Sequence, residues 1–271
     1  MRRFPLWSWF WFLLGTLYFF LPLLGTLNFS LRIRRDVLSL DAYNNALTDP
    51  EFIRTFVFSN QMAVMTILVS ILLIVPTAYW AHLRLPQVRP ALDFITLMPF
   101  VIPAIILVFG LIKTYSRPLT VFGLPVVPPL TNTVFSTNIL LIFGYTVLCL
   151  PYMYRSVDNG LRAMDVRTLT EAAQILGAGW PTILFRIILP NLRTALLSGA
   201  LLTFSIVVGE LTLATFLARP AFGPYLALLG NHKPYEPFAL SLISFALTWV
   251  AMGIIQFVTR GSGQGQLAGG H

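Results

Sequence analysis

Long apolar segments separated by short polar segments dominate this chain. A hydrocarbon core about 30 Å thick takes about 20 helical residues, because each residue advances the helix by about 1.5 Å. Backbone groups in lipid must also bond internally, which favours helices. The six segments that meet these conditions are residues 6–27, 61–81, 94–112, 138–154, 195–217 and 238–258. The pattern predicts an all-α integral membrane protein with about six transmembrane helices in one domain, residues 1–260, and a flexible glycine-rich tail at 261–271.

The segments between and within these apolar runs carry further structural signals. Residues 28–60 mix charged and apolar positions, which favours short amphipathic helices on the outer face of the membrane. Residues 118–129 are rich in proline and predict an extended loop. Pro99 and Pro103 fall inside the third apolar segment, where each removes a helical hydrogen bond and favours a kink. The two prolines either bend a packing helix or contribute to a substrate pathway or gate.

Composition supports a membrane location and does not point to nucleic acid. The 271 residues are 56% hydrophobic and 10% charged, whereas soluble domains carry about 25% charged residues. Most of the arginines that give the net charge of +8 lie between apolar segments, as is typical of loops at a lipid headgroup surface. If the N-terminus lies in the cytoplasm, six crossings return the C-terminus to the cytoplasm. About ten basic residues then lie inside and about eight outside, a weak asymmetry that favours this orientation. Cys149, the single cysteine, can form no intrachain disulfide or cysteine metal cluster.

The polar segment 155–193, between the fourth and fifth apolar segments, contains a clear helical pattern over residues 168–176. Thr168 and Glu171 have the spacing of a capping box, in which both side chains satisfy backbone amides at a helix start. Gly177 can end this helix, because glycine adopts the left-handed conformation at little cost. The segment therefore predicts a short helix with a glycine corner.

A second short helix is predicted from Pro181, a favoured first helical position, to near Pro190. The whole segment then shows one spaced pattern. It reads Glu171-Ala172-Ala173, three residues, Gly177, nine residues, and Ile187-x-Leu189-Pro190. This pattern resembles the signature loop of the permease subunits of binding-protein-dependent, ATP-binding-cassette (ABC) importers. The alternative is a helix hairpin on the membrane surface with coincidental spacing.

Two further segments look similar to the same family, so the resemblance covers most of the chain. They are Met98-Pro99-Phe-Val-Ile-Pro103 and Gly209-Glu210-Leu211. The resemblance implies a type I importer fold located in a prokaryotic inner membrane. It also implies a coupling helix over residues 168–176 that docks in a groove of an ATPase and transmits its motion to the spans.

The resemblance gives each loop residue a role. Ala172 and Ala173 allow close backbone approach, Glu171 can pair with a basic residue of the ATPase, and Gly177 sets the turn towards span five. Thr168 belongs to the coupling helix, and the remaining coupling residues are Ile187, Leu189 and Pro190. The implied partners are ABC ATPase subunits, a second permease that gives a heterodimer, a periplasmic or lipid-anchored binding protein, and membrane lipid.

The chain has no Gly-x-x-x-x-Gly-Lys-Ser/Thr loop to hold phosphates. We therefore expect a non-enzymatic subunit without its own cofactor or metal, with ATP and Mg²⁺ bound by the partner ATPase. Glu210 lies inside the fifth apolar segment, where a charged side chain costs about 2.5–3.5 kcal/mol. It either lines the pathway or gate, or is a hydrogen-bonded or protonated carboxyl that holds spans together.

The nearest resemblance is to permeases for polyamines such as spermidine and putrescine, and a membrane carboxylate suits a cationic solute. Ferric iron, aminoethylphosphonate, thiamine and sulfate are the alternative solutes within the same class. A secondary transporter that needs no ATP is the more remote alternative. It should show an internal repeat, which the sequence does not display.

Overall fold

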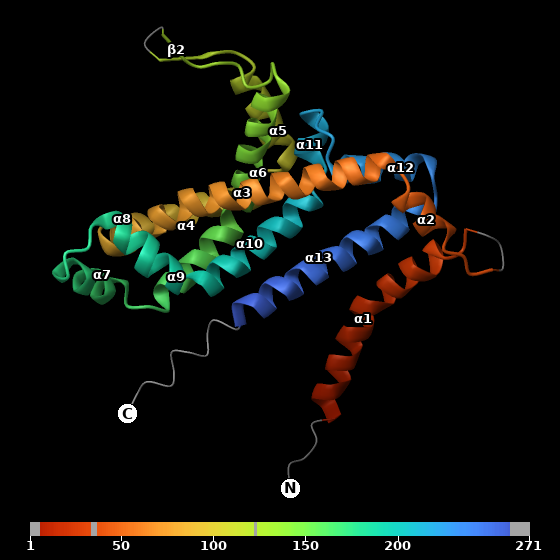
Figure 1. Ribbon diagram of the computed structural model, residues 1–271, viewed down its shortest axis with the longest axis horizontal. Coiled ribbons are helices and arrows are strands. Elements are labelled where there is room, and N and C mark those ends of the chain that lie inside the picture. Colours follow the sequence, from red (N-terminus) through yellow and green to blue (C-terminus); the bar gives the residue numbers. More distant parts are fainter. Residues whose placement is uncertain (1–5, 34–36, 122–123, 261–271) are drawn as a thin grey trace. The chain divides into compact units, whose positions relative to one another are not determined.

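The computed structural model describes residues 6–33, 37–121 and 124–260, and helix dominates them (Figure 1). The elements are α1 (Leu6–Ser30), α2 (Asp41–Leu47), α3 (Pro50–Leu83), a 3₁₀ turn (Pro86–Val88), α4 (Arg89–Val101), α5 (Ala104–Tyr115), β1 (Leu119–Val121), β2 (Leu124–Val127), α6 (Val134–Arg162), α7 (Val166–Ile175), α8 (Trp180–Thr182), a π-helix (Ile183–Ile188), α9 (Leu189–Asn191), α10 (Arg193–Val208), α11 (Thr212–Phe216), α12 (Phe222–His232) and α13 (Glu236–Arg260). The expected all-α class is confirmed. The tail expected at 261–271 lies outside the described residues.

Within the described residues, α1, α3 and α6 are each long and apolar enough to cross a membrane. Two bent pairs also pass the same test. The first joins Pro86–Val101 to α5 at 103°, and the second joins Trp180–Asn191 to α10 at 75°. The count is therefore three helices, or up to five if each bent pair forms one span. The C-terminal helix α13 has 25 residues. The expected total of six spans stays a prediction.

Pro103 interrupts the third predicted span. Helix α4 ends at Val101, and Ile102 takes an extended conformation with ψ of 114°. The helical region is disfavoured for a residue that precedes proline, which explains the break. Pro103 then caps α5. Pro99 lies within α4 without breaking it, so the expected kink occurs at only one of the two prolines.

The chain divides into two compact units, and the larger comprises Arg54–Pro224 together with Thr259 and Arg260. A buried cluster of this unit joins residues of α3, α6, α7, the π-helix and α10. Members from these elements include Tyr79, Met153, Val157, Ala173, Ile183, Ile188 and Leu196. Helices α6 and α10 approach closely, because a Cβ at Gly160 would lie 2.6 Å from the Cβ of Ala195. The loop between α6 and α10 is thus packed into the same core as the helices it connects.

Two short elements lie in the segments predicted to flank the spans. The amphipathic pattern of residues 28–60 gives one short helix, α2, and then the start of α3, which begins at Pro50 and continues through the second predicted span. The proline-rich segment forms an antiparallel hairpin of β1 and β2. A capping box follows it, because the Thr133 hydroxyl accepts from the Ser136 backbone N–H at 3.1 Å and the Ser136 hydroxyl accepts from the Thr133 N–H at 3.2 Å. This arrangement explains why α6 begins at Val134.

The smaller unit comprises the described residues up to Ile53 and Tyr225–Val258. The ring of Phe29 on α1 lies 5.0 Å from that of Tyr235 and 4.8 Å from that of Phe238. The hydroxyl of Tyr225 donates to the Asp49 carboxylate at 2.9 Å. Most of α1 is not covered by protein in this chain. A helix of this kind needs lipid or another subunit around it.

Candidate functional site

Helix α7 carries the first part of the motif, and Asp165 begins it rather than Thr168. The Asp165 carboxylate accepts the backbone N–H of Thr168 at 3.1 Å and its hydroxyl at 2.6 Å. These bonds hold the pKa of Asp165 below its usual value, because they stabilise the charged form. The expected capping box at Thr168 and Glu171 is therefore wrong. Glu171 instead accepts from Arg167 Nε at 2.8 Å, one turn earlier on the same exposed face.

Gly177 ends α7 in the way the sequence predicted. Its φ is +80°, in the left-handed region. The Ala178 N–H donates to the Ala173 carbonyl at 2.9 Å, and the Gly177 N–H donates to the Gln174 carbonyl at 2.9 Å. These two bonds form a Schellman motif, which satisfies carbonyls left open at the end of a helix. The spacing between Ala173 and Gly177 in the sequence motif is the spacing that this motif requires.

The two alanines of the motif differ in burial, because neighbouring helix residues point in different directions. Ala173 is buried and belongs to the core, together with Val166 about two turns earlier. Ala172 is exposed, as are Ile175 and Leu176, each 86% exposed at the end of the helix. The expectation that both alanines offer close approach to a partner thus fits only Ala172. Ala173 instead lets α7 lie close to its own core.

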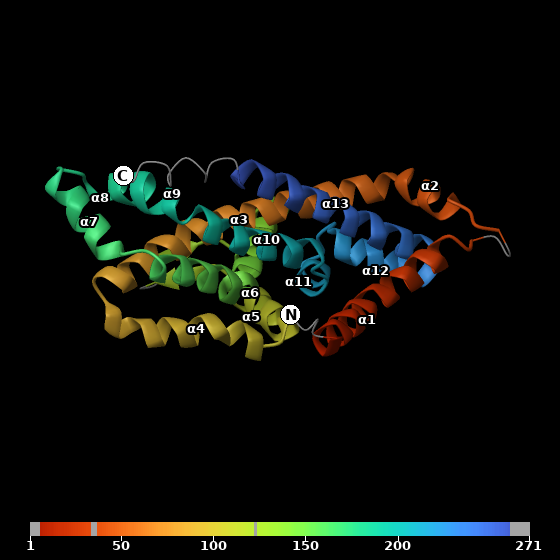
Figure 2. The same cartoon turned by 90° about the horizontal axis from the view of Figure 1, so that it is seen from below.

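The second predicted helix forms as the continuous turns of α8, the π-helix and α9, which follow one another at one end of the larger unit (Figure 2). Pro181 lies in its first turn, as expected. Ile187 and Leu189 are half-buried against the core, and Pro190 is exposed in α9. The motif residues on this helix therefore serve mainly to attach the loop to the spans.

Aromatic and hydroxyl contacts join the loop to α3. The hydroxyls of Tyr79 and Thr170 lie 2.9 Å apart, and both side chains are buried. The ring of Trp180 lies 4.8 Å from that of Tyr79 and 4.5 Å from that of Trp80. A displacement of α7 must therefore act on α3 as well as on α10.

A buried ionic cluster surrounds Asp158 and was not predicted from the sequence. Its carboxylate lies 2.7 Å from His82 Nε2, 2.6 Å from Arg162 Nε and 3.5 Å from an Arg89 amino group. These partners come from α3, α6 and the start of α4. A signal was present in the sequence, because Asp158 and Arg162 are four residues apart, a spacing that favours an ion pair on a helix.

Glu210 lies at a break between α10 and α11 that the sequence did not predict. The expected span over 195–217 is interrupted here, and the Glu210 carboxylate accepts backbone N–H groups of the next helix. The distances are 2.7 Å from Thr212, 3.0 Å from Leu213 and 3.3 Å from Ala214. The carboxylate is thus a helix cap inside an apolar segment.

The predicted site residues fall in separate places. The coupling residues gather at one end of α10, whereas Glu210 follows its other end, and the 16 residues of α10 span about 24 Å. Pro103 marks a third position, at the bend between α4 and α5. The geometry therefore separates a loop site from a membrane break.

The apolar helices, with a partly exposed helical loop between two of them, mark this chain as an integral membrane protein. Residues 74–261 match the family model of the binding-protein-dependent transport system inner membrane component. The chain belongs to this family and is a non-catalytic permease subunit of an ABC importer.

Proteins similar to this chain agree with that family. The spermidine/putrescine transport system permease protein PotB of Haemophilus influenzae is 27% identical over 82% of this chain and 78% of that protein. PotB of Escherichia coli is 30% identical over 71% of this chain and 73% of that protein. PotC of Haemophilus influenzae is 32% identical over 44% of this chain and 48% of that protein.

A solved structure supports the fold. The crystal structure of a bacterial ABC transporter involved in the import of the acidic polysaccharide alginate matches with a TM-score of 0.69. It covers 95% of this chain and 96% of that chain at 15% identity. At this identity the likeness concerns the fold alone.

Proposed function

We propose that this permease subunit moves a polyamine across the inner membrane, driven by an ATPase that docks on α7. In this proposal α7 faces the cytoplasm and both chain termini lie there. ATP and Mg²⁺ bind to the ATPase, a periplasmic or lipid-anchored binding protein delivers the solute, and a second permease completes a heterodimer. The exposed end of α7 is the observation that carries the proposal.

The exposed face of α7 fits a partner groove. Ile175 and Leu176 project from a polar loop, and apolar side chains this exposed outside long apolar helices are typical of interaction sites. Ala172 beside them lets a partner backbone come close. The other face of α7 is fixed in the core through Val166 and Ala173. A helix held on one face and free on the other can bind a partner and transmit its displacement.

A copurification experiment tests the docking surface. We expect the double variant Ile175→Ser, Leu176→Ser to lose the ATPase during purification of the assembled transporter, because the buried apolar contact is lost. Val126→Ser is the matched control, since Val126 is 62% exposed on β2. Full recovery of the ATPase with the double variant would reject α7 as the docking helix.

The polyamine proposal is supported by the names of the relatives. Both PotB and PotC are spermidine/putrescine permeases, and each resembles this chain. Uptake of labelled putrescine and spermidine into cells or vesicles that carry the complete transporter tests it. We expect uptake that depends on this chain and on ATP. Uptake of iron, thiamine, sulfate or aminoethylphosphonate in place of polyamines would overturn the solute assignment and leave the permease class intact.

A further inference from the structure

The exposed faces of α3 and α10 in the larger unit differ in chemistry. Five exposed side chains along the middle of α3 are apolar, between the exposed polar residues Gln61 and Thr77 at its ends. They are Val64, Met65, Leu68, Leu72 and Leu73. On α10 the exposed face carries Thr194, Ser198 and Ser205, with Leu202 among them. Spacings of four and seven residues place the three hydroxyls on one side of the helix. Hydrocarbon suits the α3 face and penalises the α10 face.

Four uncharged polar side chains of α6 and α10 have no hydrogen-bond partner among the described residues. In the described part of the chain, no hydrogen bond forms from the side chains of Ser156, Asn159, Thr194 or Ser205, and Ser198 reaches only the Thr194 carbonyl at 3.1 Å. The buried threonine hydroxyls of α6, Thr137 and Thr146, donate instead to carbonyls of the preceding turn. Lipid tails offer no replacement, so water or another polar group must meet these side chains.

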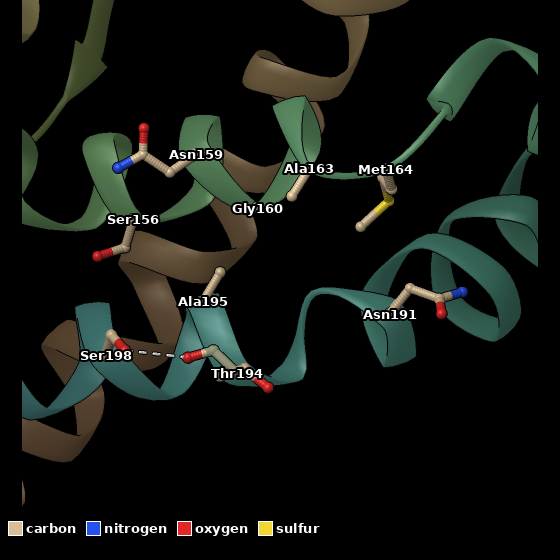
Figure 3. A pocket seen from close by; sticks show the side chains of 9 residues that line it. All are labelled: Ser156, Asn159, Gly160, Ala163, Met164, Asn191, Thr194, Ala195 and Ser198. Atoms are coloured by element: carbon tan, nitrogen blue, oxygen red, sulfur yellow. Dashed lines mark hydrogen bonds between the residues drawn. The ribbon is translucent and has the colours of Figure 1, made fainter. Parts of the chain in front are cut away.

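A pocket of about 460 Å³ opens between α6 and α10 where these side chains gather (Figure 3). Its lining includes Ser156, Asn159, Gly160, Thr194, Ala195 and Ser198. No ionisable side chain lines it, and its hydroxyl and amide oxygens can accept hydrogen bonds from a solute. The pocket lies at the end of α10 that joins the coupling loop, and the polar face continues from it to Ser205.

We infer that this face of α6 and α10 lines the cytoplasmic part of the solute pathway, from the break at Gly209 to the pocket. The inference rests on the proposed function, in which α7 faces the cytoplasm. The 15 residues from Thr194 to Gly209 span about 22 Å, which is most of a hydrocarbon core. The solute class is a small hydrogen-bond donor, such as an alkylammonium ion. Neutral oxygens bind it weakly, and a pathway needs sites that the solute can leave.

Cysteine accessibility tests the pathway cleanly, because Cys149 is the only cysteine of the chain and is buried. In a Cys149→Ala background, Ser198→Cys and Ser205→Cys are compared with Leu72→Cys, whose side chain is 65% exposed on the apolar face of α3. The assembled transporter in inside-out vesicles is treated with a charged methanethiosulfonate reagent. We expect both serine positions to react at least about tenfold faster than Leu72→Cys, because the reactive thiolate forms in water.

Each outcome bears on one claim. If Ser198→Cys and Ser205→Cys react no faster than Leu72→Cys, or crosslink to the second permease on oxidation, the face meets lipid or a subunit and the inference fails. Fast reaction that putrescine slows supports both the pathway and the polyamine proposal. Fast reaction that putrescine leaves unchanged supports the pathway and counts against that solute.

A second pair of variants covers the effect of the label itself. We expect the Ser198→Leu and Ser205→Leu variants to assemble normally with the ATPase and to lose most uptake. Leucine removes the hydroxyl that accepts hydrogen bonds from the solute, and its larger side chain narrows the pathway. Normal uptake by both leucine variants would overturn the pathway, because a lipid-facing position tolerates leucine.

Discussion

At the scale of single residues, Gly177 has the simplest role to test. A Cβ added there meets no atom within 4 Å, so only the backbone conformation opposes substitution. The left-handed region costs an L-residue about 1–2 kcal/mol, and asparagine tolerates it better than a β-branched residue. We expect Gly177→Val to abolish ATP-driven uptake and weaken ATPase recovery, whereas Gly177→Asn keeps most of both. Equal activity of the valine variant and the unmodified protein would refute a role for this corner.

Asp165 makes the start of α7 sensitive to acid. Its pKa is lowered by the hydroxyl and backbone N–H of Thr168, so the charged form stabilises the fold. This stabilisation is present above the ordinary aspartate pKa of 3.8 and is lost as pH falls through the lowered value. The protection factors of the α7 amides, which compare their hydrogen exchange with the intrinsic rate at each pH, should fall in that acid range. Asp165→Asn should show a smaller fall, and an identical pH profile for the two proteins would argue against the cap.

At the scale of elements, the break after α10 depends on two features. They are the Glu210 carboxylate and the close approach of Gly223 to the backbone of Glu210. A Cβ at Gly223 would collide with the backbone carbonyl of Glu210. We expect Gly223→Ala to disrupt the break and to lower uptake by the assembled transporter.

Glu210→Gln should keep most uptake, because its amide oxygen can still accept backbone N–H groups. Glu210→Ala loses the cap, which is worth about 1 kcal/mol at helix starts, and uptake should fall. Loss of uptake with Glu210→Gln would show that the charge itself serves transport.

These elements also show what the sequence could and could not predict. The end of α7 was predictable, because the Ala173 to Gly177 spacing and a glycine suffice for a Schellman motif. The start was not, since Asp165 and Thr168 are both good capping residues and lie three positions apart. The break at Glu210 was hidden because the apolar run continues through it, and it depends on the distant Gly223. The Asp158 cluster likewise joins residues that are remote in the sequence.

At the scale of the whole molecule, two contacts from the end of α3 connect the coupling loop with the spans. Tyr79 meets Thr170 on α7, and three residues later His82 meets Asp158 on α6. Leaving the buried Asp158 oxygen without its histidine partner costs about 1–3 kcal/mol. The end of α3 is therefore a position where force on α7 can pass into α6. Removing both contacts should therefore uncouple ATP hydrolysis from solute transport while the ATPase and the spans stay intact.

The double variant Tyr79→Phe, His82→Ala tests this transmission in the assembled transporter. We expect ATP hydrolysis to continue while uptake falls about tenfold, a change that corresponds to about 1.4 kcal/mol. Val126→Ser is the control, because Val126 is 62% exposed on β2, outside the coupling loop and its contacts, and the change should leave uptake and hydrolysis unchanged. A parallel loss of both activities would indicate misfolding, and thermal unfolding of the purified complex would reveal it. An unchanged ratio of solute taken up to ATP hydrolysed would mean that these two contacts are not needed for coupling. Force would then reach the spans along the chain itself, from α7 through the π-helix to α10.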